Sequence, residues 1–100
     1  MAVKILGGLW KGASLAVNER LTRPTGVMLK RKIFDSRQDL TGKVFIDLCA
    51  GSGSMGVEAH SRGAHRVFFV ESSKEVFRQL QSSIKLLKEN RSIDVSNLHL

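Results

Sequence analysis

Apolar and polar positions divide the chain into a short N-terminal region and a longer region of alternating strands and helices. Residues 3–6 and 9–17 are two largely apolar runs joined by Gly7 and Gly8, which favours a β-hairpin with a tight two-residue turn. Apolar residues at mixed helical spacing over 26–35, interspersed with lysine and arginine, predict a basic amphipathic helix. Residues 1–43 are therefore predicted to form a hairpin and a helix.

From residue 44 onward the pattern is that of an α/β layer. Residues 44–49 (VFIDLC) form an almost continuous apolar run, typical of a strand buried on both faces of a parallel sheet. A helix through about Arg62, a second strand over 66–71 and a long helix over 73–90 follow, and a third strand begins near Ser96. Short crossovers in this order give parallel strands with right-handed connections, so the predicted fold is a doubly wound α/β layer.

Local signals mark the helix ends. Gly63 is well placed as the left-handed residue that ends the first of these helices. The segment 72–75 (SSKE) has the sequence of a capping box, in which the Ser72 hydroxyl and the Glu75 carboxylate would each bond a free backbone amide of the long helix. The predicted apolar stripe of that helix comprises Val76, Phe77, Leu80, Ile84 and Leu87.

Composition is that of one small globular domain. The chain has 100 residues, of which 42% are hydrophobic and 25% charged, and this usage excludes an intrinsically disordered chain. Its single cysteine, Cys49, can form no internal disulfide, and no histidine has ligand spacing with it, so no metal site is expected. The sequence shows neither a signal peptide nor a membrane-spanning run, and we expect a soluble, cytoplasmic protein.

Positive charge is concentrated at the N-terminus. Residues 1–43 hold 9 lysines and arginines against 3 acids, a balance of +6, whereas residues 44–100 hold 7 against 6, a balance of +1, which together make the net +7. A clustered basic region attracts phosphate backbones through counterion release, which suggests a nucleic-acid partner. A solvated basic surface without a partner is the alternative.

Glycines at 51, 53 and 56 follow a predicted strand and open a predicted helix, which is the context of a nucleotide-type loop. Glu71 lies 20 residues after Gly51, at the end of the next strand, where an acid can accept hydrogen bonds from both ribose hydroxyls. Together these features predict a cofactor site. The alternative is structural: the glycines permit tight helix–strand packing, and Glu71 caps the next helix.

Asp47 separates two classes of cofactor. In a dinucleotide fold the strand usually runs apolar into the first glycine, whereas here an acid stands four positions earlier. The stretch VFIDLCAGSGSMGVEA resembles the first motif of class I methyltransferases, in which the acid orders the loop or contacts the methionine end of S-adenosylmethionine. An Asp47 that only bonds loop amides, without touching a ligand, is the alternative.

The resemblance extends over almost the whole chain to one bacterial family. The opening KILGGLWKG, the segment TRPT with the following KRKIF, the block DLCAGSGSMGVEAHSRGA and the strand VFFVE look like the ribosomal RNA small subunit methyltransferase D family, which modifies a guanine 2-amino group in 16S rRNA. The resemblance implies that residues 1–43 are an RNA-facing extension. It also implies that residues 44–100 are the first half of a Rossmann-like, S-adenosylmethionine-binding domain, ending after the start of its third strand.

Site residues follow from the positions that match the family. The predicted cofactor-binding residues are Asp47, Ala50, Gly51, Ser52, Gly53, Glu71 and Ser72. The residues expected to face RNA or the mouth of the active site are Lys4, Trp10, Lys11, Arg23, Thr25 and Lys30. For Trp10, packing of the hairpin onto the domain is the alternative to stacking on a base.

The chain departs from the family at two places. Val27 and Met28 stand where members usually have an acid and an arginine. The Asp/Asn-Pro-Pro-aromatic motif that holds the target base is absent, because Pro24 is the only proline, and so we expect the catalytic residues to lie beyond Leu100. Without the strand that precedes that motif, one edge of the sheet would be open to pairing with another chain. We therefore expect a fragment, a natural truncation or one half of an intertwined homo-oligomer.

Three functions remain at this point. The first is an rRNA guanine methyltransferase that binds S-adenosylmethionine and acts on ribosomal RNA or the small ribosomal subunit. The second is a non-catalytic RNA-binding or assembly module that kept the fold without the reaction. The third, a domain that binds an NAD-type dinucleotide, rests only on the glycine spacing and Glu71.

Overall fold

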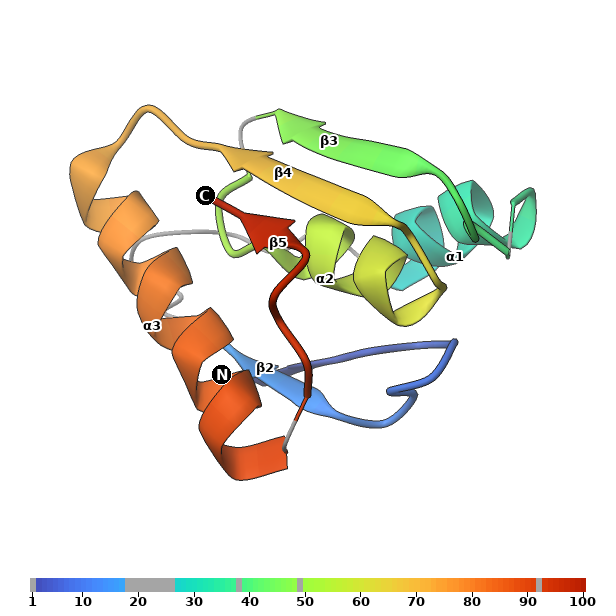
Figure 1. Ribbon diagram of the computed structural model, residues 1–100, viewed down its shortest axis with the longest axis horizontal. Helices are drawn as coiled ribbons and strands as arrows, with labels where there is room; N and C mark the ends of the chain where they lie inside the picture. The colour runs from blue at the N-terminus through green and yellow to red at the C-terminus, as the bar shows by residue number, and fades with distance from the viewer. Residues whose placement is uncertain (1, 18–26, 38, 49, 92) are drawn as a thin grey trace.

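The described part of the chain folds into a small parallel sheet that has its helices and a two-stranded hairpin on one side (Figure 1). The computed structural model describes residues 2–17, 27–37, 39–48, 50–91 and 93–100. Its elements are strands β1 (Ala2–Lys4) and β2 (Ser14–Ala16), helix α1 (Val27–Asp35), strand β3 (Val44–Leu48), helix α2 (Ser54–Ser61), strand β4 (Arg66–Val70), helix α3 (Lys74–Arg91) and strand β5 (Leu98–His99). This order confirms the predicted α/β fold with parallel strands, but the described helices cover one face of the sheet and not both, as a doubly wound layer would require.

The parallel sheet has the order β3-β4-β5. β3 pairs with β4 from Val44 opposite Arg66 to Leu48 opposite Val70, and β4 pairs with β5 over two residues. Helices α2 and α3 make the two crossovers. Because parallel strands all end at the same edge of a sheet, the loops that follow β3 and β4 are brought together there.

The face of the sheet away from the helices is open. Along β3 the side chains alternate, and those at 44, 46 and 48 are 55%, 59% and 70% exposed. No described element packs against this face (Figure 1), so the expectation that this strand is buried on both faces is wrong for the described part of the chain. β3 also lies at the edge of the described sheet, and pairing of copies through this edge stays a prediction.

The predicted hairpin forms, but not with the predicted turn. β1 and β2 are antiparallel, and the Ile5 amide and the Ala13 carbonyl continue the ladder at 2.8 Å. The connection is therefore a longer loop, in which Gly7 and Gly8 lie against the end of α2 and do not form a two-residue turn. A Cβ on Gly8 would lie 2.0 Å from the backbone oxygen of Ser61, so glycine is needed there for close approach to α2.

One hydrophobic core joins the hairpin to the parallel sheet. Leu15 of β2 is 1% exposed and belongs to the same buried cluster as Val67 of β4 and Leu80 of α3. Polar contacts fix the same interface, because the Ser83 hydroxyl on α3 donates to the Ala16 carbonyl at 2.7 Å. The N-terminal region is thus packed into the α/β layer, and the predicted stripe of α3 supplies buried side chains at 80, 84 and 87.

The helix ends confirm one prediction and correct another. Gly63 has a φ of 96° and closes α2 with two hydrogen bonds, from its own amide to His60 and from the Ala64 amide to Ala59. At the start of α3 it is the Ser73 hydroxyl, and not that of Ser72, that accepts an amide hydrogen bond of the first turn, at 3.4 Å. The helix begins one residue later than the capping-box prediction requires. None of the described helices is long and apolar enough to cross a bilayer.

Candidate cofactor-binding site

The loop after β3 is compact and depends on its glycines. Gly51 and Gly53 have φ values of 54° and 82°, in the left-handed region that glycine adopts without strain. The Gly53 amide donates to the Ala50 carbonyl at 2.8 Å, and Ala50 in turn donates to the end of β4. A Cβ on Gly53 would lie 2.3 Å from Leu80, so the loop is pressed onto α3.

Glu71 connects this loop to the start of α3. One carboxylate oxygen accepts the Gly51 amide at 2.9 Å, and the other accepts the Ser73 amide at 3.0 Å. These two bonds lower the pKa of Glu71, that from Ser73 having the larger effect, and the group is a carboxylate at neutral pH. A hollow of about 380 Å³ opens beside it, lined by Glu71, Ser72, Lys74, Phe77, Arg78 and Gln81.

Asp47 lies under the same loop. Its carboxylate accepts the Gly56 amide at 3.2 Å. Burial, with a smaller contribution from the nearby charge of Glu71, raises the pKa of Asp47 to about 6 in spite of this bond. Asp47 and Glu71 therefore place two negative charges at the edge of the sheet where β3 and β4 end.

The remaining predicted cofactor residues differ in how accessible they are. Ala50 and Ser52 are buried, and the Ser52 hydroxyl accepts the Ser54 amide at 3.4 Å, inside the loop. Ser72 is exposed at the rim of the hollow. Gly56 packs α2 against β4, because a Cβ there would lie 2.3 Å from the ring of Phe69. The structural roles that the sequence left open are therefore present: the glycines permit close packing, Glu71 accepts an amide at the start of α3, and Asp47 bonds a loop amide. Contact of these residues with a cofactor stays a prediction.

The residues expected to face RNA differ in their surroundings. Lys4 and Lys11 are exposed, whereas Arg23 and Thr25 lie outside the described residues. Trp10 stacks on the His60 ring at a centroid distance of 4.4 Å and packs the hairpin loop onto α2, which is its alternative role. One face of its ring is therefore already used.

Lys30 requires a correction. It is 2% exposed, and its ammonium lies 3.5 Å from a carboxylate oxygen of Glu58 and 3.3 Å from the Lys4 carbonyl. Burial lowers the pKa of Lys30, while the charge of Glu58 opposes this effect. Because its charge faces the interior and is paired there, Lys30 is a structural residue and does not present its ammonium to RNA.

Glu58 is the buried residue that the sequence analysis missed. It is fully buried, and its carboxylate accepts hydrogen bonds from the Leu6 amide at 2.8 Å, the Gly7 amide at 3.0 Å and Arg62 at 2.9 Å, besides pairing with Lys30. It thus holds the hairpin loop, α1 and the end of α2 together. Its partners in the hairpin loop are more than 50 positions away in the sequence. The only local signal for Glu58 was therefore its position inside a short helix, which does not indicate a buried role.

Metal chemistry has no support in the described part of the chain. Among those residues, no group of three or more His, Cys, Asp or Glu side chains is arranged to hold a metal ion. The buried His60 uses one ring nitrogen on the Asp94 carbonyl at 2.7 Å and stacks on Trp10. Its surroundings are those of a packing residue.

Comparison with known proteins places this architecture in a family. The family model described as "Conserved hypothetical protein 95" matches residues 3–99, which is nearly all of the chain. The chain belongs to this family. Family relatives include "Ribosomal RNA small subunit methyltransferase D" of Haemophilus influenzae, 41% identical over 88 residues that cover 86% of this chain and 46% of the relative. The resemblance seen in the sequence is confirmed.

Two further relatives come from Escherichia coli. "Ribosomal RNA small subunit methyltransferase D" of strain K12 is 32% identical over 88 residues, which cover 86% of this chain and 44% of the relative. A solved structure named "Putative methyltransferase yhhF" aligns with a TM-score of 0.77 at 28% identity, covering 99% of this chain and 51% of that one. The chain thus spans about half the length of the relatives it matches, and it has the fold of their matching half.

Proposed function

We propose that this chain is the cofactor-binding part of an rRNA methyltransferase that transfers a methyl group from S-adenosylmethionine to a guanine 2-amino group in 16S rRNA. The observation that carries the proposal is the Glu71 carboxylate, which joins the glycine loop to α3 through the Gly51 and Ser73 amides. Support for the reaction class comes from the relatives, which are named as ribosomal RNA methyltransferases.

The acids and the hollow fit S-adenosylmethionine. Each Glu71 oxygen accepts one backbone hydrogen bond and keeps a second acceptor site, which leaves room for both ribose hydroxyls. The adjacent hollow presents the Phe77 ring and the Ser72 hydroxyl, which suit an adenosine group. Asp47 adds negative charge beneath the loop, which favours a cationic ligand.

In this proposal the bound cofactor supplies the reactive methyl group on its sulfonium, and the residues of this chain hold and orient it. Glu71 fixes the ribose, and the glycine loop lets the ligand approach the backbone closely. Asp47 orders the loop through Gly56 or contacts the methionine end of the cofactor. The exposed lysines of the N-terminal region supply attraction for RNA.

A methyl-transfer assay tests the function. Because the catalytic residues are expected beyond Leu100, the assay uses this chain continued to the full length of its relatives. That protein is incubated with S-adenosylmethionine carrying a labelled methyl group and with unmodified 16S rRNA or small subunits, and the digested nucleosides are analysed by mass spectrometry. We expect label in N2-methylguanosine, and a Glu71→Ala variant that loses at least tenfold in rate at low cofactor concentration. Glu75→Ala, which removes an exposed acid in the first turn of α3, is the matched control and should behave as wild type.

Other outcomes would favour the other functions. If the protein binds S-adenosylmethionine and RNA but labels no nucleoside, the non-catalytic RNA-binding module is favoured. If it binds NAD in place of S-adenosylmethionine, the dinucleotide-binding domain is favoured. Label in a nucleoside other than a guanosine would retain the methyltransferase and refute the target.

A further inference from the structure

A second hollow lies at the opposite end of α2 from the glycine loop. It has a volume of about 320 Å³ and is mostly polar, and we call it the hairpin hollow. Its lining residues are Leu6, Gly7, Gly8, Lys11, Arg31, Asp35 and Arg62. Since α2 has eight residues, the two sites are separated by about 12 Å along the helix.

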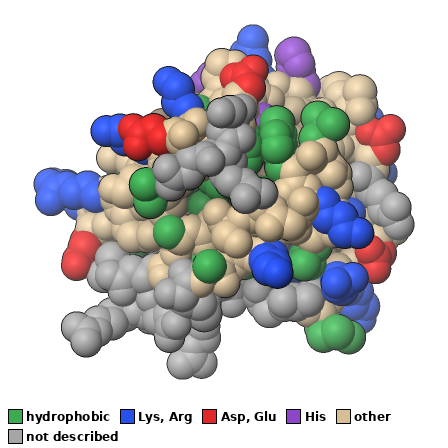
Figure 2. Space-filling view, turned by 90° about the horizontal axis from the view of Figure 1, so that it is seen from below, with side chains coloured by type: hydrophobic (Ala, Val, Ile, Leu, Met, Phe, Trp, Pro, Cys, Tyr) green, Lys and Arg blue, Asp and Glu red, His purple; other side chains and the backbone are tan. Residues whose placement is uncertain are grey.

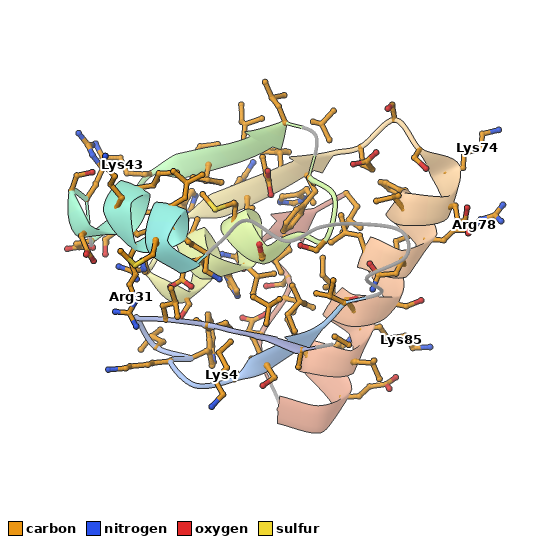
Figure 3. The ribbon with its side chains drawn as sticks, turned by 180° about the vertical axis from the view of Figure 1, so that it is seen from behind. Lys4, Arg31, Lys43, Lys74, Arg78 and Lys85 are labelled. Atoms are coloured by element: carbon orange, nitrogen blue, oxygen red, sulfur yellow. The ribbon has the colours of Figure 1, made fainter. Side chains whose placement is uncertain are left out.

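Three cations converge on the hairpin hollow from three separate segments. Lys11 comes from the hairpin loop, Arg31 from α1 and Arg62 from the end of α2. Figure 3 shows Arg31 extending from α1 on the hairpin side, at the other end of the molecule from Lys74 and Arg78. Figure 2, seen from the hairpin side, shows several lysine and arginine side chains close together with acidic ones beside them.

Arg62 is held in place, whereas the other two cations are free. The Arg62 guanidinium donates to Glu58 at 2.9 Å and lies 5.1 Å from the centre of the Phe34 ring, so little side-chain entropy is lost when it binds a further group. Within the described residues, neither Lys11 nor Arg31 has an ion-pair partner, and both are exposed. Asp35 is the one acid in the lining, so the three cations of the lining outnumber the acids there.

This arrangement suits an anion recognised through side chains. The Leu6 and Gly7 amides are already bonded to Glu58, so they are not available to a ligand, and the charged contacts must come from the three cationic side chains. Two arginines and a lysine around an open hollow match the tetrahedral oxygens of a phosphate. A Cβ on Gly7 would lie 2.8 Å from the Arg62 guanidinium, so glycine at this position leaves that group uncovered. Such contacts position a nucleic-acid backbone without reading its bases.

We propose that the hairpin hollow binds one phosphate of the RNA backbone and so fixes the RNA relative to the cofactor loop. The proposal rests on the proposed function, because it takes RNA as the partner. It assigns RNA contact to Arg31 and Arg62, which the sequence did not single out, together with Lys11. Lys30, although one position from Arg31, takes no part because it is buried and does not line the hollow.

The test compares two double variants that remove equal charge. The test variant carries Lys11→Ala and Arg31→Ala, which remove the two unpaired cations of the hairpin hollow. The control variant carries Lys85→Ala and Lys88→Ala, which remove two exposed lysines of α3. Binding of a fluorescently labelled single-stranded 16S rRNA fragment is followed by anisotropy at several salt concentrations. We expect the first variant to bind roughly tenfold more weakly and to lower the salt slope by about 0.7, the value for one phosphate on a single strand. The control should stay within about twofold of wild type, and thermal unfolding by circular dichroism checks that both variants fold.

Asp35→Asn gives the opposite perturbation. It removes the acid from the lining and is expected to tighten RNA binding a few-fold without changing the salt slope. Equal RNA affinity in wild type and the Lys11/Arg31 double variant, or equal weakening in that variant and its α3 control, would overturn the proposal.

Two further titrations separate this proposal from its alternatives. Inorganic phosphate is titrated into wild type and into the Lys11/Arg31 variant by calorimetry: if phosphate binding is lost in the variant while RNA binding is unchanged, the hollow takes free phosphate and the RNA proposal is wrong. S-adenosylmethionine is titrated in parallel and should bind both proteins equally. Failure of S-adenosylmethionine to bind wild type would refute the proposed function, whereas a failure confined to RNA refutes only the role of the hollow.

Discussion

Asp47 holds a negative charge in a half-buried position beneath the glycine loop, so its neutralisation should stabilise the fold. Burial raises the pKa of Asp47 from 3.8 to about 6, against the Gly56 hydrogen bond. At about 1.4 kcal/mol per pKa unit the shift sets an upper limit of about 3 kcal/mol. Solvent screening at a half-buried site reduces this to about 1–2 kcal/mol. Asp47→Asn keeps an oxygen that can accept the Gly56 amide, so the variant should be more stable than wild type by about that amount at pH 8.

The sign of the pH dependence follows from the raised pKa. Between pH 3.8 and about 6 the folded protein binds a proton at Asp47 more readily than the unfolded chain does, so this group makes wild type more stable as the pH falls through about 6. The Asn variant does not titrate there. The difference in the free energy of unfolding, variant minus wild type, should therefore be largest at pH 8 and shrink toward zero near pH 4.

Urea denaturation followed by the fluorescence of the single tryptophan measures this difference at each pH. Subtracting wild type removes the contributions of other titrating groups, such as His60. Asp39→Asn is the control, because the hydrogen bonds from Thr41 lower the pKa of Asp39, and its contribution to stability is lost as the pH falls. An Asp47→Asn variant that is less stable than wild type by the same amount at pH 8 and pH 5 would refute the reasoning.

Three other substitutions test the packing around the site. Glu58→Gln leaves two buried cations without a full partner and is expected to lower the free energy of unfolding by roughly 3 kcal/mol in urea denaturation, whereas a loss below about 1 kcal/mol would contradict its place at the centre of the network. Gly56→Ala drives a methyl group into a ring of β4 and should cost more than Gly12→Ala, which has a positive φ but open space; equal losses on thermal unfolding would mean that close packing is unimportant. Ser73→Ala should lower helix stability by about 0.5 kcal/mol and Ser72→Ala should not, and the reverse result would restore the predicted cap.

Regular elements were predictable because their signals are local. The apolar stripe of α3 recurs at helical spacing, and the buried positions Leu80, Ile84 and Leu87 are among those predicted. The strands β3 and β4 are rich in β-branched and aromatic residues, and Gly63 occupies the left-handed position that ends α2. The order of these elements then determines the parallel sheet.

Long-range polar contacts were not predictable from the same signals. Lys30 stands in a basic helix, where a lysine usually faces solvent, yet it turns inward because Glu58 is buried within reach. An acid inside a short helix gives no indication of such a role, since its partners come from the hairpin loop, α1 and the end of its own helix. Only the three-dimensional structure brings them together.

The sequence showed which glycines matter for the structure, but not why each is needed. Gly7 and Gly8 suggested a tight turn, because paired glycines between extended runs usually make one. In the structure Gly8 is needed for another reason, its contact with the backbone of Ser61. In the cofactor loop, Gly53 combines a positive φ with contact to Leu80, so local conformation and packing require glycine together.

The central claim is that the glycine loop and Glu71 hold S-adenosylmethionine, and calorimetric titration tests it most directly. The protein is titrated with S-adenosylmethionine and, separately, with NAD, at pH 8 and at pH 5. Saturable binding of S-adenosylmethionine alone is expected, weaker at pH 5 by about tenfold because Asp47 must lose its proton, and weaker by at least tenfold in Glu71→Ala. Binding that is unchanged in Glu71→Ala, or no heat with S-adenosylmethionine where NAD gives one, would contradict the claim.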